Sequence, residues 1–210
     1  MRWAGPIPAT LAARRESPPM IEQRARGHIE RYLDPIGRVL VAARFTPMAV
    51  TIVGLMLVIT GAVLVGFSVF VVGASIAALG SALDGLDGTV ARLSGKASRR
   101  GAFVDSVSDR LGETAMWAGL AFAVSDEGEV LALLCVLNLG ASLLVSYLRA
   151  RAESVGADGR GGLMGRAERV ILFTAGLVFD FVPVMLWVMA ALTWMTVAQR
   201  FSLVWRRLEP

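Results

Sequence analysis

Cysteine and histidine are nearly absent from this 210-residue chain, which has one of each, Cys135 and His28. A single cysteine cannot form an intramolecular disulfide, and we interpret Cys135, which lies in an apolar run, as a small core residue. His28 stands alone in an arginine-rich stretch, so no Cys/His spacing typical of a zinc site is present. These shortages exclude a disulfide-bonded scaffold and a structural zinc fold.

Lysine and arginine are missing from two long stretches, residues 45–91 and 111–148. Hydrophobic residues make up 55% of the chain, which is more than an ordinary soluble domain contains. Residues 1–19 contain prolines and arginines but no long apolar core, so they are not a typical signal peptide. We therefore expect an all-α integral membrane protein in the lipid bilayer, with no nucleic-acid partner. Residues 1–19 would be a tail that need not be ordered, and residues 20–210 one membrane domain.

The apolar stretches predict six transmembrane helices. At about 1.5 Å per residue, the uncharged run from residue 47 to residue 83 is too long for one crossing of a hydrocarbon core about 30 Å thick. The expected spans are residues 46–66, 69–93, 102–124, 130–152, 167–179 and 184–205. Before them, residues 20–44 place apolar residues at helical spacing with arginines opposite, which predicts an interfacial amphipathic helix that Pro35 interrupts.

The basic residues indicate how these spans are oriented. The chain has 21 lysines and arginines, and with six spans they gather at both termini and in the second-to-third and fourth-to-fifth connections. The other three connections contain none. Because lysine and arginine collect on the cytoplasmic side of a cell membrane, we expect both termini, and the facing ends of the second and third spans, to be cytoplasmic.

Four aspartates lie near those cytoplasmic ends. Asp84 and Asp87 are three residues apart, and Asp105 and Asp109 are four apart, so on helices each pair would project from one face. Carboxylates this close repel one another in a low-dielectric setting and need a cation or a shared proton. Oxygen ligands suit Mg²⁺ or Mn²⁺, which can bridge carboxylates to a diphosphate. One carboxylate must be free to accept a proton from an attacking hydroxyl.

Glycines and an arginine accompany the aspartates. Gly88 and Gly101 leave room for a close backbone approach or a flat base, and Arg92 can hold a phosphate through two hydrogen bonds. Simple pairing of the acids with Arg92, Arg110 or the basic connection is the structural alternative. An ion-coupled transporter and a catalytically inactive scaffold are functional alternatives, but acids gathered at one membrane face argue against transport. The intact set of four aspartates argues against a scaffold.

At its own spacing the segment from Asp84 to Asp109 reads D-x2-D-G-x2-A-R-x8-G-x3-D-x3-D. This resembles, without a mismatch, the signature of the CDP-alcohol phosphotransferases, in which an acceptor hydroxyl displaces CMP from a CDP-linked lipid or alcohol. The resemblance implies that the four aspartates hold two Mg²⁺ or Mn²⁺ ions and that Asp109 is also the general base. It further implies a homodimer and a CDP site formed by Asp84, Gly88, Arg92 and Gly101. Prenyltransferases of the UbiA type also combine two Asp-rich motifs with magnesium, but they are longer and lack this Gly and Arg spacing.

Arginines at three further helix ends are candidates for binding the acceptor substrate. The segments S-Y-L-R-A-R-A-E from Ser146, G-R-A-E-R from Gly165 and the late Q-R are similar to the phosphatidylinositol-phosphate and archaetidylinositol-phosphate synthases. This similarity implies that Arg149, Arg166 and Arg200 bind the phosphate of inositol 1-phosphate, with CDP-diacylglycerol as the donor. The alternative for each arginine is the positive-inside bias alone.

Two positions depart from that pattern, and one acid lies outside it. Gly165 stands where Glu is usual, and Met48 stands where Asp or Asn is usual. Another acceptor, such as glycerol 3-phosphate, or an archaetidyl donor therefore stays open. Glu113 follows Asp109 by one helical turn, and we expect it to orient Asp109 or a basic partner rather than to bind the metal.

Overall fold

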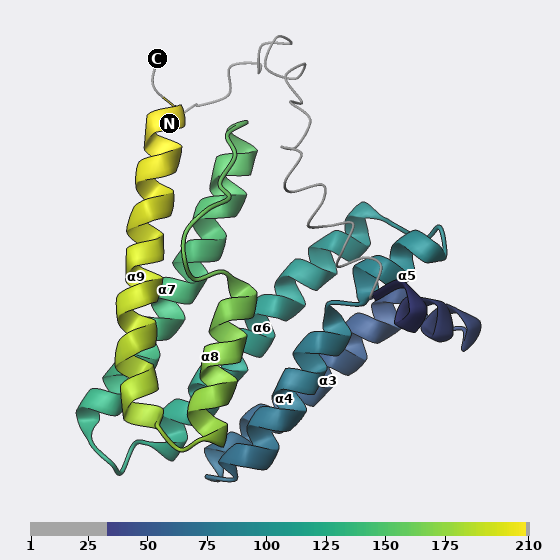
Figure 1. The fold of residues 1–210 in the computed structure, drawn as a ribbon. Helices are drawn as coiled ribbons and strands as arrows, with labels where there is room; N and C mark the ends of the chain where they lie inside the picture. The colour runs from purple at the N-terminus through teal and green to yellow at the C-terminus, as the bar shows by residue number, and fades with distance from the viewer. Residues whose placement is uncertain (1–32, 209–210) are drawn as a thin grey trace.

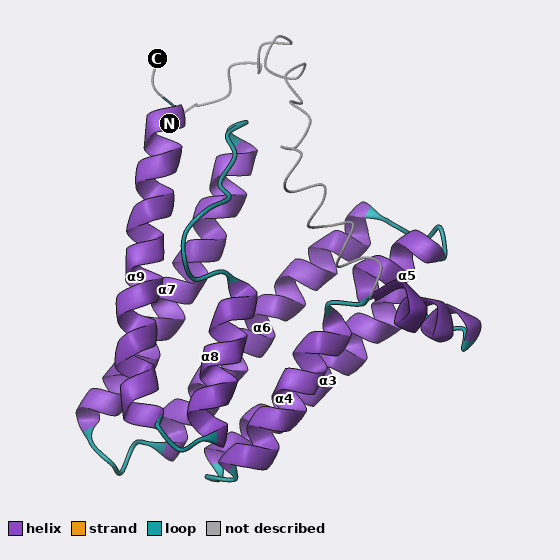
Figure 2. Cartoon of the chain, viewed as in Figure 1, coloured by secondary structure: helices purple, strands orange, loops and turns teal. Residues whose placement is uncertain are grey.

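Residues 33–208 are described by a computed structural model, and over this range the chain is entirely helical, without strands (Figure 1; Figure 2). A helix over residues 33–42 comes first. It is followed by α3 (Pro47–Gly66), α4 (Phe70–Asp84), α5 (Asp87–Leu93), α6 (Arg99–Ala123), α7 (Glu129–Ser154), α8 (Arg166–Val178) and α9 (Val182–Arg207).

Four stretches in this part of the chain are long and apolar enough to cross a membrane. They are Pro47–Gly66, Phe70–Leu93, Glu129–Ser154 and Val182–Arg207. Many large apolar side chains on them face outward, including Met56, Leu133 and Trp187, each more than half exposed. Such a large exposed apolar surface is typical of a protein surrounded by lipid. The all-helical membrane fold is thus confirmed, and α6 and the 13-residue α8 complete the bundle.

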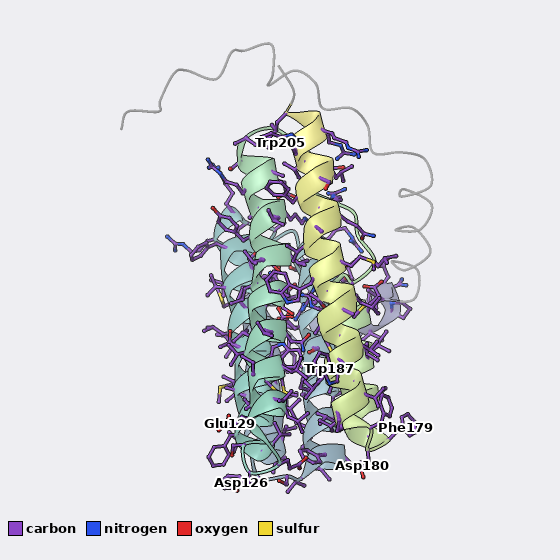
Figure 3. All side chains as sticks on the ribbon, turned by 90° about the vertical axis from the view of Figure 1, so that its left-hand side faces the viewer. Asp126, Glu129, Phe179, Asp180, Trp187 and Trp205 are labelled. Carbon is purple, nitrogen blue, oxygen red and sulfur yellow. The ribbon has the colours of Figure 1, made fainter. Side chains whose placement is uncertain are left out.

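The ends of the helices are sorted by charge as the sequence predicts. The connections at residues 67–69, 124–128 and 179–181, which lack Lys and Arg, lie together at the lower end in Figure 1. Figure 3 shows Asp126 and Asp180 at that end and Trp205 at the opposite end. The basic connections lie toward the other end of the molecule, so the four aspartates of the predicted site and these basic residues share one side.

The second predicted span differs from the structure in its continuity. The expected helix over residues 69–93 is interrupted at Gly85 and Leu86, whose amides donate to Ser81 O at 3.2 Å and Leu83 O at 2.9 Å. Asp84 is therefore the last residue of α4 and Asp87 the first of α5. The two carboxylates thus stand at the adjoining ends of two helices and not on the one continuous helix that the sequence predicts.

Capping residues explain two smaller differences. The helix expected at residue 102 begins at Arg99, because the Ser98 hydroxyl accepts a hydrogen bond from the Gly101 amide at 3.0 Å. The helix expected at residue 184 begins at Val182, with Pro183 in its first turn, where a missing amide hydrogen costs no helical hydrogen bond.

The helix over residues 33–42 turns one side toward the bundle. Leu33, Leu40 and Val41 pack against the buried Leu86 and the core around it. Its opposite side is exposed, as an interfacial helix requires. Pro35 lies in the first described turn of this helix, and the segment from which the expected break would separate it lies outside the described residues. The rest of the predicted interfacial segment and the tail at residues 1–19 lie outside the described residues.

Glycines allow α3 and α4 to pack closely. A Cβ atom on Gly61 would lie 2.5 Å from Gly73 O, and a Cβ atom on Gly73 would lie 2.8 Å from Gly61 O. Small residues permit this approach between helices in a membrane. One helical repeat further along, Gly54 faces Asp84, since its Cβ would lie 2.9 Å from that of Asp84. The close contact between α3 and α4 therefore fixes the position of Asp84 along the bundle.

Gly61→Ala is expected to destabilise the protein by about 1–3 kcal/mol, because its methyl group would meet a rigid backbone carbonyl. Gly66→Ala is the matched control, since its nearest neighbours would be 3.7 Å away. Thermal unfolding in detergent measures both. Equal melting temperatures for the two variants would contradict this account of the α3–α4 contact.

Candidate active site

Three of the predicted carboxylates converge at the ends of α4 and α6. Asp84, Asp105 and Asp109 each offer an oxygen within 4.8 Å of the other two. Asp84 is 4% exposed, and its Oδ1 atom is buried without a hydrogen-bond partner in the described part of the chain. Oxygen donors at this separation suit Mg²⁺ or Mn²⁺, and such an ion would satisfy the buried oxygen. The donor set therefore fits a divalent metal.

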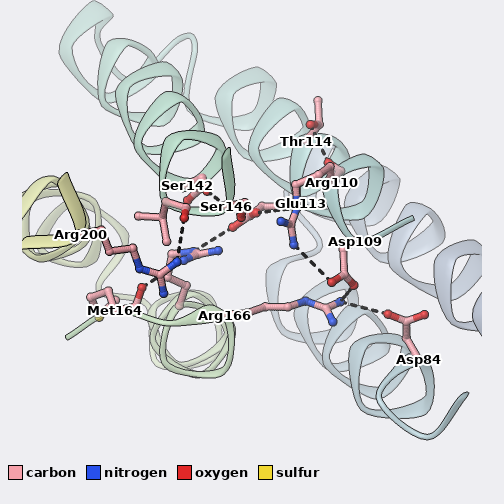
Figure 4. A network of polar contacts seen from close by, with 12 residues as sticks. Asp84, Asp109, Arg110, Glu113, Thr114, Ser142, Ser146, Met164, Arg166 and Arg200 are labelled. Carbon is pink, nitrogen blue, oxygen red and sulfur yellow. Dashed lines mark hydrogen bonds and ion pairs between the residues drawn. The ribbon is translucent and has the colours of Figure 1, made fainter. Parts of the chain in front are cut away.

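Arg166, the first residue of α8, reaches directly into this cluster. Its Nη2 atom lies 3.2 Å from Asp84 Oδ2 and 2.5 Å from Asp109 Oδ1 (Figure 4). Arg110 adds a second contact, from Nη2 to Asp109 Oδ2 at 3.3 Å. Arg166, which the resemblance assigns to the acceptor phosphate, thus contacts Asp109, which the resemblance identifies as the general base.

Asp87 lies apart from the group of three. Its Oδ2 atom accepts a hydrogen bond from the Thr51 hydroxyl on α3 at 2.5 Å. Asp87 and Asp105 both line a cavity of about 330 Å³. The other lining residues are Thr46, Pro47, Met48, Thr51, Gly88, Ala91, Lys96, Ala97, Ser98, Gly101 and Ala102. A Cβ atom on Gly88 would meet nothing within 4 Å, so this wall of the cavity is open.

The predicted CDP-binding residues are partly gathered at this cavity. Gly88 and Gly101 line it, whereas Asp84 lines a neighbouring cavity with Asp109 and Arg166. Arg92 is not among the lining residues of either cavity, and its Nη2 donates to Asp34 Oδ1 at 2.9 Å. The three converging aspartates therefore lie between two cavities.

The other two predicted acceptor arginines make different contacts. Arg149 donates to Glu153 Oε1 at 3.0 Å, one turn further along α7. Arg200 donates through Nη1 to Val145 O at 2.7 Å and through Nε to Gly161 O at 2.8 Å. Arg200 thus joins α9 to α7 and to the glycine-rich connection. Of the three arginines, Arg166 is the one that the structure brings to the aspartates.

Glu113 has the basic partner that the sequence predicts. Its Oε1 atom accepts from Arg169 Nε at 2.9 Å, and its Oε2 atom lies 3.9 Å from Arg110 Nε. Arg169 belongs to the G-R-A-E-R segment, but nothing in the sequence distinguishes it from the other arginines. Thr51 was also missed, because a threonine on an apolar helix gives no sign of a carboxylate partner 36 residues away.

The two departures from the synthase pattern both lie near the site. Met48 lines the cavity with Asp87 and Gly101. A Cβ atom on Gly165 would lie 2.7 Å from Glu168 Oε2, so the Glu168 carboxylate occupies the space beside this glycine.

Comparison with known proteins places the chain among enzymes of lipid synthesis. Phosphatidylinositol phosphate synthase of Mycobacterium marinum is 36% identical over 196 residues, 86% of this chain and 82% of the relative. Archaetidylinositol phosphate synthase of Pyrococcus horikoshii is 33% identical over 187 residues, 89% of this chain and 97% of the relative.

Solved structures give the same result. Mycobacterium tuberculosis phosphatidylinositol phosphate synthase with CDP-DAG bound superposes with a TM-score of 0.77 at 32% identity, covering 83% of this chain and 94% of that one. The same enzyme in complex with manganese and citrate gives 0.75 at 33% identity, covering 82% and 88%. Residues 44–201 match the CDP-alcohol phosphatidyltransferase family, which is more than half of the chain. The chain therefore belongs to the CDP-alcohol phosphatidyltransferase family.

Proposed function

We propose that this enzyme transfers the phosphatidyl group of CDP-diacylglycerol to inositol 1-phosphate, forming phosphatidylinositol phosphate and releasing CMP. The observation that carries the acceptor assignment is the contact of Arg166 with Asp109 at 2.5 Å. A guanidinium that binds a phosphate also places that acceptor's hydroxyl groups near the carboxylate. The similarity to phosphatidylinositol phosphate synthases supports the same assignment.

The two cavities suggest separate places for the two substrates. The cavity with Gly88, Gly101 and Asp105 is proposed for the CDP group, whose phosphates would point toward the aspartates. Lys96 at its rim adds positive charge. The acceptor phosphate would bind on the Arg166 side, with Arg149 and Arg200 on the same side of the membrane. The carboxylates would then lie between donor and acceptor, where the transfer must occur.

Asp109 is proposed as the general base. It would take the proton from the acceptor hydroxyl while the hydroxyl oxygen forms a bond to the phosphorus of the phosphatidyl group. The bond from that phosphorus to the CMP phosphate breaks, and CMP leaves with the electron pair. Arg166 and Arg110 hold Asp109 in place through both of its oxygens, which keeps the base oriented before the reaction.

Asp84, Asp87, Asp105 and Asp109 would hold Mg²⁺ or Mn²⁺, with two ions expected. When bound, the ions would neutralise the charge that develops on the leaving CMP. Manganese in the related Mycobacterium tuberculosis structure supports this choice.

Removal of divalent metal with EDTA is expected to abolish CMP release, and added Mn²⁺ should restore it. Asp105→Asn should weaken Mn²⁺ binding at least about tenfold, measured by calorimetry without substrate. Asp158→Asn, in the connection before α8, is the control. Unchanged Mn²⁺ affinity in Asp105→Asn would exclude this carboxylate as a ligand.

The proposed setting is a cell membrane crossed six times by a homodimer. The four apolar stretches would be joined by α6 and α8 as the remaining spans, with residues 20–210 forming one domain. The amphipathic helix would lie at the interface, and the aspartates, arginines and both termini would face the cytoplasm. The sorting of charged connections to opposite ends supports this orientation.

A CMP-release assay in detergent, with CDP-diacylglycerol, Mg²⁺ and a panel of acceptors, tests the proposed function. Release is expected with inositol 1-phosphate and not with inositol. Release with glycerol 3-phosphate alone would overturn the acceptor and leave the chemistry intact. Faster release from CDP-archaeol than from CDP-diacylglycerol would instead assign the archaetidyl donor of the Pyrococcus horikoshii relative.

A further inference from the structure

Helices α6 and α8 face one another across a cavity and are joined by three side-chain contacts, each about one helical turn deeper than the last. These contacts are Asp109–Arg166 at 2.5 Å, Glu113–Arg169 at 2.9 Å and the edge-on rings of Trp117 and Phe173, whose centres are 4.9 Å apart. The spacing of four residues on α6 and three or four on α8 places all three contacts on the facing sides. The middle contact is the charged one to which the proposed reaction gives no role.

Arg169 is 3% exposed and is held by two groups. Its Nε atom donates to Glu113 Oε1 at 2.9 Å, and its Nη1 atom donates to Met164 O at 3.1 Å. The Met164 amide in turn donates to the Thr196 hydroxyl on α9 at 2.9 Å. Arg169 therefore connects α6, α8 and the end of the glycine-rich connection, which is itself attached to α9.

These contacts lie on both sides of Arg166 in the sequence. Met164 precedes Arg166 by two residues, and Arg169 follows it by three. Arg166 begins α8, and no side chain forms a capping hydrogen bond to the free amides of its first turn. The Arg169 guanidinium binds the Met164 carbonyl, which precedes this turn, and Glu113 on α6. It therefore attaches the first turn of α8 to α6 at a point one helical turn from Asp109.

Burying an arginine and a glutamate carries a large desolvation cost, and apolar residues of similar size often give a protein equal stability. The next contact, Trp117–Phe173, is such an apolar pair. Stability alone therefore does not explain a charged pair in the middle position. The directed hydrogen bonds of a planar guanidinium can instead fix how α8 is oriented relative to α6.

We propose that Glu113 and Arg169 form a positioning pair that sets the distance between the acceptor-phosphate ligand Arg166 and the base Asp109. This inference rests on the proposed function of Arg166. Both residues line the cavity that Asp109 and Arg166 also line, and the role proposed for them is positioning through their own hydrogen bond rather than contact with substrate. The pair acts through the first turn of α8, and its loss should impair use of the acceptor far more than binding of the CDP-lipid.

Arg169→Lys tests this proposal, because lysine keeps the charge but cannot make both directed contacts of the guanidinium. We expect the acceptor KM to rise about tenfold and the KM for CDP-diacylglycerol to stay within about twofold. Phe173→Leu is the matched control at the next contact of the same helix. It should lower the melting temperature and leave the acceptor KM unchanged.

Glu113→Gln keeps size and packing and provides a second variant if Arg169→Lys fails to fold. It should raise the acceptor KM in the same direction and by a smaller factor. The proposal is overturned if the folded variant raises both KM values equally, or if Phe173→Leu raises the acceptor KM as much. The acceptor is the one that the wild-type enzyme uses in the CMP-release panel, so an error in the acceptor's identity is detected separately.

Discussion

Asp109→Asn is expected to lower kcat for CMP release about a thousandfold, because asparagine cannot accept the proton of the acceptor hydroxyl. Asparagine has nearly the same shape, and its one oxygen can still accept a hydrogen bond from Arg110, so the fold and the affinity for CDP-diacylglycerol should be preserved. The measurement is the rate of CMP release at saturating substrates, together with direct binding of the CDP-lipid.

Asp126→Asn is the control for this substitution, since Asp126 is exposed in the connection at the opposite end of the molecule. Binding of Mn²⁺ by Asp109→Asn separates loss of the base from loss of a metal ligand. If Mn²⁺ binding is retained and turnover falls, the role as base is supported. A rate close to that of the wild type would remove Asp109 from this role.

Arg166→Gln is expected to raise the acceptor KM by roughly 10- to 150-fold, which corresponds to the 1.5–3 kcal/mol of a hydrogen bond to a charged group. The affinity for the CDP-lipid should change little, because the proposed donor cavity has no contribution from Arg166. Initial rates at varied acceptor and varied donor concentrations measure the two KM values separately.

Arg151→Gln is the control, since Arg151 is exposed on α7 and contacts Ser154 of its own helix. A general loss of positive charge would affect both variants. If Arg166→Gln changes both KM values by the same factor, its assignment to the acceptor is contradicted.

The family and most of the helices could be predicted from the sequence, and three of the four predicted aspartates converge in the structure. Asp105 and Asp109 meet as their interval of four residues predicts, because that interval places two side chains on one face of a helix. Asp84 joins them from α4, a contact between helices that their spacing does not determine. The turn between Asp84 and Asp87 was not predictable, because an interval of three residues fits a continuous helix and no proline marks the break.

The contact partners of the arginines could not be predicted from the sequence. Arg166 and Arg200 have the same chemistry, yet one contacts the aspartates and the other holds two backbone carbonyls. The Glu113–Arg169 pair joins residues 56 positions apart. Such differences depend on which helices are neighbours, and the charge pattern gives only the side of the membrane.

Arg166 and Asp109 are proposed to direct a phosphorylated acceptor onto the CDP-lipid together. The most direct test of this proposal uses inositol 1-phosphate with a radiolabelled phosphate, CDP-diacylglycerol and the purified enzyme. We predict that label enters the organic phase in equal amount to the CMP released, because the acceptor keeps its phosphate in the lipid product. CMP release with all label remaining in the aqueous phase would contradict the account.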